Sequence, residues 1–376
     1  MMTTVTWTIE AEDGDARTGW LDTPHGRVRT PAFMPVGTRA AVKTVDSGDL
    51  ERVGTEILLA NTYHLMLRPG STVVGKLGGI HEFMGWTRPI LTDSGGFQIF
   101  SLEPVIDEGG ARFRSVYDGS MVDLTPEEAI RIQEELGPDI AMTLDVCVGL
   151  PAPRRQVVAE MERTLRWAER CRAAHTRPDQ ALFGIVQGGT DPDLRAESAS
   201  RTAQLDFPGF GIGGLSVGET AEERDLALES AVAELPSSKP RYVMGLGDTD
   251  GLLEAIRRGA DMFDCVLPTR LARHGKAVTR HGDFSLRNAV FEADEGPIDD
   301  ACQCLTCQGY SRAYLRHLVR LKEITASRLL TIHNLTYTLG LVRSAGEAID
   351  EGVFPAFADA VKARRSGGSP FGHCSV

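Results

Sequence analysis

The chain has 376 residues, of which 42% are hydrophobic and 24% are charged. This composition is typical of a globular protein and excludes a disordered or fibrous chain. The net charge of −12 disfavours nonspecific nucleic-acid binding by the whole surface, although a local basic patch can still form. The sequence shows no signal peptide at its start and no apolar run near ~18 residues, so we expect a cytoplasmic protein without a membrane span.

Eight short apolar runs alternate with segments of helical pattern along the chain. Val158, Met161 and Leu165 recur at helical spacing, and a capping box from Thr125 to Glu128 predicts the start of a helix. Eight strands separated by helices predict an α/β fold, the (β/α)8 TIM barrel. The predicted strands are Ala32–Val36, Glu56–Asn61, Pro89–Thr92, Ile140–Leu144, Leu182–Val186, Phe210–Gly213, Tyr242–Leu246 and Met262–Cys265.

Polar residues or glycines follow several of these strands. In a barrel of this kind the catalytic groups collect where the strands end, so we expect these residues to share one rim. Each residue alone could instead serve as an ordinary turn residue. The residues at these positions are Asp93, Asp145, Gln187, Gly213, Gly214 and Asp264.

Asp264 closes the last apolar run, within the segment DMFDCVLPTR. An ionisable group at the end of a buried strand is costly to place, so it is more often catalytic than structural. We therefore predict that Asp264 is a nucleophile. Asp93 would then be the second carboxylate of a sugar-cleaving pair, in which one group attacks the anomeric carbon and the other moves protons on the departing group.

A basic strip follows Asp264. Between Val266 and Val290, five Arg or Lys residues stand against a single carboxylate, Asp283. A basic strip beside an active site predicts an anionic substrate, whereas the alternative is an ordinary solvated loop. The basic residues are Arg270, Arg273, Lys276, Arg280 and Arg287.

The residues at the predicted rim suit a planar, polar ring. Asp145 could accept two parallel hydrogen bonds from a guanine edge, while Gln187 and the Gly214 N–H could donate to a carbonyl oxygen. Phe97 and Met244 could sandwich the ring faces, and the alternative for both is packing in the core.

Three of the seven cysteines are clustered late in the chain, in an arrangement that suggests a metal site rather than disulfides. Cys302, Cys304 and Cys307 form a C-x-C-x2-C pattern, whose thiolates can converge on one structural Zn2+ ion, with His333 as the fourth ligand. The alternative to a metal site is a chance cluster of reduced thiols. Other candidates for the histidine ligand are His281 and His317.

Together, these motifs resemble the queuine/tRNA-guanine transglycosylase family of the bacterial type. The resemblance implies a TIM barrel with a zinc subdomain inserted late in the chain, and a homodimer. It also implies exchange of guanine at the wobble position of tRNA anticodons for a 7-deazaguanine base. The motifs are TDSGGFQ at 92–98, IVQGG at 185–189, GIGGLSVGE at 211–219, MFDCVLPTR at 262–270, and CQCLTC with TIHN.

The resemblance also implies roles for individual residues. Asp264 would hold the RNA covalently while guanine leaves, and Asp93 would be the acid and base for the departing and incoming rings. Leu215 and Glu219 would contact the substituent of the incoming base. The remaining implied roles are base binding by Asp145, Gln187, Gly214, Phe97 and Met244, RNA binding by Arg270, Arg273 and Lys276, and zinc binding by Cys302, Cys304, Cys307 and His333.

One segment departs from the commonest bacterial pattern, which has an acidic residue after the first aspartate. Here the run is Asp145-Val146-Cys147, and Val146 is closer to eukaryotic members, whereas Cys147 and Val217 are bacterial in character. The resemblance therefore favours prequeuine base as the incoming base, with queuine as the alternative.

The expected organisation is a barrel over residues 1–290, a zinc subdomain over 291–335, and C-terminal helices with a tail over 336–376, the tail itself being 364–376. Two rival functions remain open: a retaining glycoside hydrolase on a TIM barrel and a non-catalytic tRNA-binding partner subunit. The hydrolase would not need base-binding residues or a basic strip, and the presence of both Asp93 and Asp264 speaks against the inert subunit.

Overall fold

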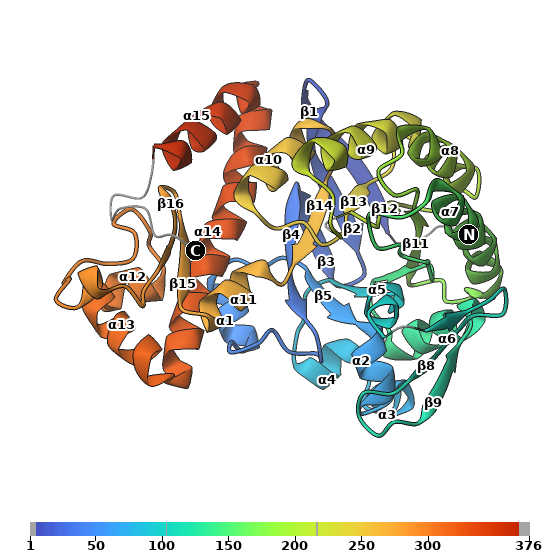
Figure 1. The fold of residues 1–376 in the computed structure, drawn as a ribbon, viewed down its shortest axis with the longest axis horizontal. Coiled ribbons are helices and arrows are strands. Elements are labelled where there is room, and N and C mark those ends of the chain that lie inside the picture. Colours follow the sequence, from blue (N-terminus) through green and yellow to red (C-terminus); the bar gives the residue numbers. More distant parts are fainter. Residues whose placement is uncertain (1–4, 103, 216, 368–376) are drawn as a thin grey trace.

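The computed structural model describes residues 5–102, 104–215 and 217–367 and contains a closed barrel of eight parallel strands (Figure 1). All eight predicted strands are confirmed, although several end earlier than expected. The strands, in order around the barrel, are β4 (Ala32–Gly37), β5 (Leu58–Asn61), β6 (Ile90–Asp93), β10 (Ile140–Met142), β11 (Ala181–Val186), β12 (Phe210–Ile212), β13 (Arg241–Val243) and β14 (Met262–Cys265).

The register of the strands closes the barrel and sets the place of Asp264. Strand β14 pairs with β4, so that Asp264 lies opposite Met34, and β6 pairs with β10 through Leu91 and Ile140. Consecutive parallel strands leave their carboxyl ends at one rim. The polar residues that follow them are therefore brought together, as the sequence predicts.

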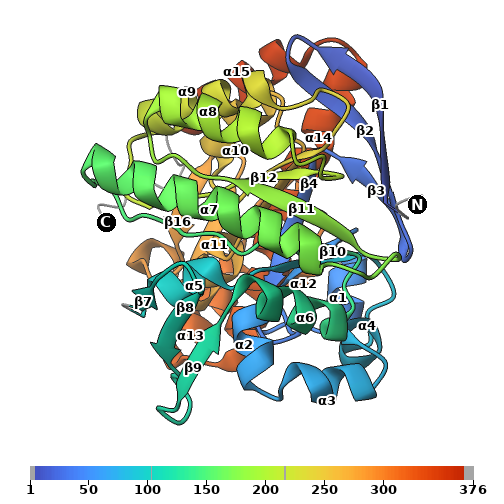
Figure 2. The same cartoon turned by 90° about the vertical axis from the view of Figure 1, so that its right-hand side faces the viewer.

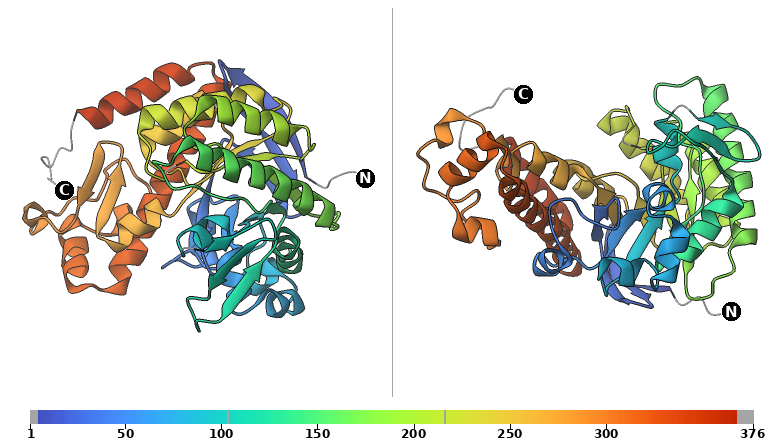
Figure 3. Two further views of the ribbon diagram at one scale, coloured as in Figure 1. Left: turned by 45° about the vertical axis from the view of Figure 1, so that its right-hand side comes forward. Right: turned by 90° about the horizontal axis from the view of Figure 1, so that it is seen from below.

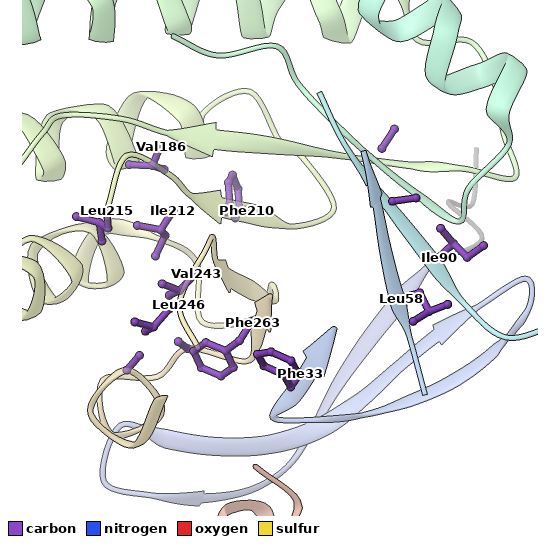
Figure 4. Close-up of a cluster of buried hydrophobic side chains, with 14 of the residues drawn as sticks. Phe33, Leu58, Ile90, Val186, Phe210, Ile212, Leu215, Val243, Leu246 and Phe263 are labelled. Atoms are coloured by element: carbon purple, nitrogen blue, oxygen red, sulfur yellow. The ribbon is translucent and has the colours of Figure 1, made fainter. Parts of the chain in front are cut away.

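Successive side chains along each barrel strand point alternately into two hydrophobic layers, one outside the barrel and one inside it. Phe33 packs on the outer side with residues such as Phe263 and Ile212, as Figure 4 shows. The next residue, Met34, belongs to the second cluster, with Met142 and other residues of the barrel interior. Both faces of each strand are thus buried, which explains why the strands appear in the sequence as continuous apolar runs.

The helices surround the barrel and extend to one side of it (Figures 1 and 2). The N-cap predicted at Thr125 is confirmed, but the Glu128 carboxylate accepts hydrogen bonds from Arg131 rather than completing a capping box. The α-helices are α1 (Ser47–Arg52), α2 (Thr62–Leu67), α3 (Ser71–Lys76), α4 (Ile80–Met84), α5 (Gly96–Phe100), α6 (Pro126–Leu136), α7 (Arg154–Ala174), α8 (Pro192–Ala203), α9 (Ala221–Glu234), α10 (Thr249–Arg257), α11 (Leu267–Arg273), α12 (Leu305–Gly309), α13 (Arg312–Leu321), α14 (Ile324–Asp350) and α15 (Phe354–Ser366).

Within the described residues, three smaller antiparallel sheets, which the sequence did not predict, accompany the barrel. The first covers the amino end of the barrel, because its Leu21 and Val28 share a hydrophobic cluster with Ala32 and Ile140, which begin two barrel strands. The strands are β1 (Thr6–Asp13), β2 (Ala16–Thr23) and β3 (Gly26–Thr30) in this sheet, β7 (Val105–Ile106), β8 (Ala111–Arg114) and β9 (Met121–Leu124) in the second, and β15 (Lys276–Thr279) and β16 (Gly282–Ser285) in the third.

The cysteine-rich segment packs on α14, on the side of the barrel away from α7 (Figure 3). Its hydrophobic cluster includes Cys304 and Cys307 and extends back to Ala272 and Phe284. The domain boundaries at residues 290 and 335 stay a prediction. Most of the predicted tail, from residue 368 onwards, lies outside the described residues. Within the described part of the chain, no helix has both the length and the apolar character needed to cross a bilayer.

Candidate active site

A pocket of about 290 Å³ opens at the carboxyl rim of the barrel. Its walls come from residues of β4, β5, β6, β13 and β14 and from the loops that follow β6, β10, β12, β13 and β14. The pocket brings together eight of the predicted site residues, which lie far apart in the sequence. These are Asp93, Phe97, Asp145, Gly214, Leu215, Met244, Asp264 and Arg270.

One oxygen of Asp264 is fixed by two donors. Its Oδ1 accepts hydrogen bonds from the Tyr242 hydroxyl at 2.6 Å and from the Gly245 N–H at 2.8 Å. Among the described residues, none donates a hydrogen bond to Oδ2. Burial raises the pKa of Asp264, and the two hydrogen bonds oppose that rise. The carboxylate is therefore held in one orientation with an oxygen available for attack.

Asp93 has a different environment at the same pocket. Its Oδ2 accepts from the Asn61 amide at 2.5 Å and from the Gln98 amide at 2.9 Å, and its Oδ1 accepts from the Thr62 N–H. Burial raises the pKa of Asp93 to about 6, and the negative charge of Asp264 contributes to the rise. A carboxyl group that titrates near neutral pH can both donate and accept a proton, which suits a general acid and base.

Asp145 and Gln187 are joined in one polar wall. The Gln187 amide donates to Asp145 Oδ2 at 2.6 Å, and the Ser94 hydroxyl lies 3.4 Å from Oδ1. Burial raises the pKa of Asp145 despite these bonds. Gly96 lies against this wall, since a Cβ there would come within 2.5 Å of Asp145 Oδ1. The buried wall can accept hydrogen bonds from the edge of a planar base.

Gly214 completes the wall from the loop after β12. Its φ of +66° favours glycine, and a Cβ at this position would lie 2.2 Å from Gln187 Oε1. Arg195, which is fully buried in α8, donates to the carbonyl oxygens of Gly213 and Gly214 and holds the loop in place. Leu215 lines the pocket, whereas the Glu219 carboxylate accepts from the Val217 N–H.

Phe97 and Met244 both reach the pocket. The Phe97 side chain is 56% exposed, so the alternative that it packs in the core is wrong. Met244 is partly buried and lines the pocket while also packing against the barrel interior. An exposed aromatic ring at the mouth of a pocket is available to stack on a planar ligand.

The predicted RNA-binding residues lie on α11 and on the strand that follows it. Arg270 lines the pocket, and the Arg273 guanidinium donates to the Thr269 carbonyl oxygen. Burial and the charge of Arg270 lower the pKa of Arg273. Lys276 begins β15 and does not line the pocket. Arg270 thus lies at the same pocket as Asp93 and Asp264, whereas Lys276 lies outside its lining.

The four predicted metal ligands form one cluster. Their ligand atoms all lie within 4.8 Å of one another, and Nδ1 of His333 lies 3.3 Å from Cys307 Sγ and 3.7 Å from Cys304 Sγ. The opposite ring nitrogen, Nε2, lies 3.0 Å from the Val278 carbonyl oxygen, an arrangement that orients histidine ligands in metal sites. Three thiols and an imidazole at these distances could hold a metal ion. Cys302 completes the set.

Several site residues were not identified from the sequence. Asn61 and Gln98 bind Asp93, Tyr242 binds Asp264, and Arg195 supports Gly214. Asn61 ends a predicted strand, so the rule that selected the other rim residues would also have found it. Gln98 lies inside the motif TDSGGFQ. Tyr242 and Arg195 gave no such signal, because a tyrosine in an apolar run and an arginine in a helix are ordinary.

Comparison with known proteins gives one consistent result. A family model described as queuine tRNA-ribosyltransferase matches residues 12–367. The chain is 54% identical to the queuine tRNA-ribosyltransferase of Herpetosiphon aurantiacus, over 95% of this chain and 92% of that protein. It is 53% identical to that of Moorella thermoacetica (93% and 95%) and 50% identical to that of Thermus thermophilus (96% and 94%). The chain therefore belongs to the queuine tRNA-ribosyltransferase family.

Proposed function

We propose that the protein is a tRNA-guanine transglycosylase of queuosine biosynthesis, which exchanges guanine at the anticodon wobble position for a 7-deazaguanine base. The observation that carries this function is the pairing of two carboxylates in different environments at one pocket, beside a wall suited to a purine-like edge. Family membership over nearly the whole chain gives the substrate class. Neither rival function is favoured, because the pocket combines both carboxylates with base-binding residues.

The first half of the reaction uses both carboxylates. Asp264 Oδ2 attacks the anomeric carbon of the ribose, and the bond from that carbon to the guanine ring nitrogen breaks. The electron pair goes to the nitrogen, which takes a proton from Asp93. Asp264 is then bonded to the ribose as an ester, and Asp93 is ionised. The pKa of about 6 for Asp93 supports this order, because part of the population holds the proton near neutral pH.

The second half reverses these steps with a different base. Asp93 takes the proton from the ring nitrogen of the incoming 7-deazaguanine, and that nitrogen attacks the anomeric carbon. The ester bond to Asp264 breaks, and its carboxylate is restored. The Tyr242 hydroxyl and the Gly245 N–H stabilise the departing carboxylate charge through Oδ1. No strand of the RNA is cut, and no co-reactant is needed.

Base recognition is assigned to the polar wall and to the Phe97 and Met244 side chains beside it. Asp145 accepts from the donors of the base edge, and Gln187 and the Gly214 N–H donate to its carbonyl oxygen. Phe97 and Met244 cover the two faces. Gln98 Oε1 is buried and lacks a hydrogen-bond partner within the described residues, so a donor from the bound nucleotide can satisfy it. Arg270, Arg273 and Lys276 bind the RNA backbone.

Prequeuine base is the incoming base we favour over queuine. Cys147 lines the pocket, and burial raises the pKa of its thiol to about 12, so the side chain is small and uncharged. Leu215 and Glu219 are the residues we assign to the substituent of the ring. Competition between the two bases in one incorporation assay distinguishes them, since preferential incorporation of queuine would contradict this choice.

Zinc is the metal we propose for the cysteine cluster. Three thiolates and one imidazole form a closed tetrahedral set, which is typical of a structural Zn2+ site that contributes to folding. The cluster would be held by Cys302, Cys304, Cys307 and His333 and lies outside the active-site pocket. The ion would thus stabilise the fold, and none of the reaction steps depends on it.

A cytoplasmic homodimer completes the proposal. The tRNA substrate is what supports the cytoplasmic compartment. Leu321 and Ile324, on either side of the turn between α13 and α14, have exposed fractions of 59% and 79% and could form part of a dimer contact. Sedimentation measurements test this part, because a Leu321→Glu/Ile324→Glu variant should shift the protein toward the monomer.

The central test is incorporation of radiolabelled guanine into unmodified tRNA. Wild-type protein should incorporate the label and form a denaturant-resistant adduct with the RNA, and Asp264→Asn should form none, because an amide is a poor nucleophile. Asp206→Asn is a matched control, since Asp206 is 80% exposed and its φ of +51° suits asparagine. An adduct of wild-type yield in Asp264→Asn would refute the assignment of the nucleophile.

A further inference from the structure

Arg195 is a buried cation that forms no ion pair with another described residue. Its side chain is fully buried in α8 and is absent from every ion pair found in the described part of the chain. Burial lowers the pKa of Arg195 to about 10, against the opposing effect of Cys147 and Glu219, so the guanidinium stays charged at neutral pH. Buried charges in proteins are usually paired with an opposite charge or a metal ion. The role of this charge therefore depends on its other contacts.

The Arg195 guanidinium donates to four backbone carbonyl oxygens. Its Nε lies 2.7 Å from the Gly189 oxygen, and its Nη1 lies 3.1 Å from the Val186 oxygen. Nη1 and Nη2 also reach the Gly213 and Gly214 oxygens, at 2.7 and 3.2 Å. The first two oxygens belong to β11 and the loop after it, and the other two belong to the loop after β12. Arg195 therefore joins the two loops that build the base-binding wall.

The hold on two successive carbonyl oxygens also fixes the direction of two N–H groups. The peptide bonds that follow Gly213 and Gly214 are not among the cis bonds of the described chain. In a trans peptide the C=O and the N–H point to opposite sides. Arg195 holds both carbonyl oxygens from the protein interior and does not line the pocket. The N–H groups of Gly214 and Leu215 therefore point away from Arg195, toward the pocket that these two residues line.

Neither of these N–H groups has an acceptor among the described residues. The preceding N–H, that of Gly213, donates to the Val186 carbonyl oxygen, but the Gly214 and Leu215 N–H groups form no such bond. Leu215 is only 4% exposed, so bulk water has little access to it. Buried backbone donors are almost always paired in native proteins. Two adjacent donors left without an acceptor at a pocket therefore indicate that a ligand supplies one.

We propose that Arg195 is a positioning residue that makes the pocket select a base with an oxygen on the ring edge that faces the Gly214 and Leu215 N–H groups. The inference rests on the proposed function and adds to it a second donor, the Leu215 N–H, and the residue that directs both donors. The cation bonded to the two carbonyl oxygens polarises both peptides, which strengthens their N–H groups as donors. An amino group at the same ring position would bring its hydrogens against the two donors and leave all of them unpaired.

The test compares the binding of two bases by calorimetry on the whole protein without tRNA. 7-Deazaguanine carries the oxygen, and 2-amino-7-deazapurine carries a hydrogen atom in its place. The ratio of their Kd values reports what the oxygen contributes, and it should be about 30 or more in wild type, because two hydrogen bonds are lost. In Arg195→Gln the ratio should fall about fivefold, the equivalent of one misaligned hydrogen bond. The change at the neighbouring ring nitrogen is the same in every variant and cancels when the ratios are compared.

Arg241→Gln is the matched control for the loss of a buried arginine. Arg241 is 7% exposed, begins β13 at the amino end of the barrel, and donates to the Leu235 and Gly259 carbonyl oxygens outside the pocket. This variant should lower the Tm, as Arg195→Gln does, but keep the wild-type ratio. A general loss of stability reduces the binding of both bases alike and leaves the ratio unchanged.

Arg195→Lys is a second variant, which keeps the test decisive if Arg195→Gln does not fold. It retains the charge but has a single nitrogen that cannot hold four carbonyl oxygens, so the ratio should fall here too. A wild-type ratio in the Arg195 variants would overturn the inference, as would an equal fall in Arg241→Gln or a ratio near one in the wild type. Absence of guanine exchange into tRNA, with the base selectivity intact, would instead refute the proposed function.

Discussion

Tyr242→Phe tests how the barrel prepares its nucleophile. The substitution removes only the hydroxyl that donates to Asp264 Oδ1 at 2.6 Å and keeps the ring, which is fully buried in the barrel interior. A hydrogen bond to a charged group contributes about 1.5–3 kcal/mol. Since one pKa unit corresponds to about 1.36 kcal/mol, losing the bond should raise the pKa of Asp264 by about 1–2 units.

The consequence appears in the pH dependence of adduct formation. Asp264 must be ionised to attack, so the rate falls as the pH drops through its pKa. In Tyr242→Phe the acidic limb of the pH–rate profile should move to higher pH by about 1–2 units. At a given pH on that limb, the rate of adduct formation should then be about 10- to 100-fold lower than in wild type. The basic limb, which reflects loss of the proton from Asp93 with its pKa of about 6, should move little.

The assay is the single-turnover rate of adduct formation at each pH, read on a denaturing gel. Tyr337→Phe is the control, because the Tyr337 hydroxyl bonds with Thr249 and Arg365 outside the active-site pocket. The control should show the wild-type profile. If Tyr242→Phe keeps the wild-type acidic limb, the hydroxyl does not set the protonation of Asp264, and the reasoning fails.

Three further predictions concern other parts of the molecule. Gly214→Ala should raise the KM for the incoming base by about tenfold, because its Cβ would overlap the Gln187 amide; an unchanged KM would remove Gly214 from the site. Cys304→Ser should lose bound metal, measured by elemental analysis, and lower the Tm with it. Burial raises the pKa of Asp139, but the His81 ring nitrogen 3.3 Å away and hydrogen bonds from the Ile90 N–H and His25 lower it overall to about 2. Because that pKa lies below the unfolded value, Asp139 should contribute about 2 kcal/mol of stability above about pH 4, lost as the pH falls toward 2; unfolding of wild type and Asp139→Asn across this range would show it.

Much of the barrel could be predicted because its signal is local. Each strand is a continuous apolar run, since both faces are covered, and each run is followed by a helical pattern. The small sheets were missed for the opposite reason. Val105 and Met121 are 66% and 51% exposed, so strands such as β7 and β9 lack the apolar run that marks a buried strand.

The residues of the candidate active site also divide into those that a local sequence signal marks and those that it does not. Asp93, Asp145 and Asp264 could be found because a carboxylate at the end of an apolar run is locally unusual. Phe97 was ambiguous, because an aromatic residue after a strand is equally consistent with core packing, and only its exposure decides. Tyr242 could not be found, since the role of its hydroxyl depends on Asp264, which lies on the neighbouring strand.

The sequence by itself determined which chemical groups the protein carries and the order of its barrel strands. The tertiary structure alone decided what those groups can do. Asp93 and Asp264 are the same residue type, yet Asp93 accepts from Asn61 and Gln98, while Asp264 accepts from Tyr242 and Gly245. The reason is that burial and hydrogen-bond partners set the energy of a charge, and both are supplied by segments distant in the chain.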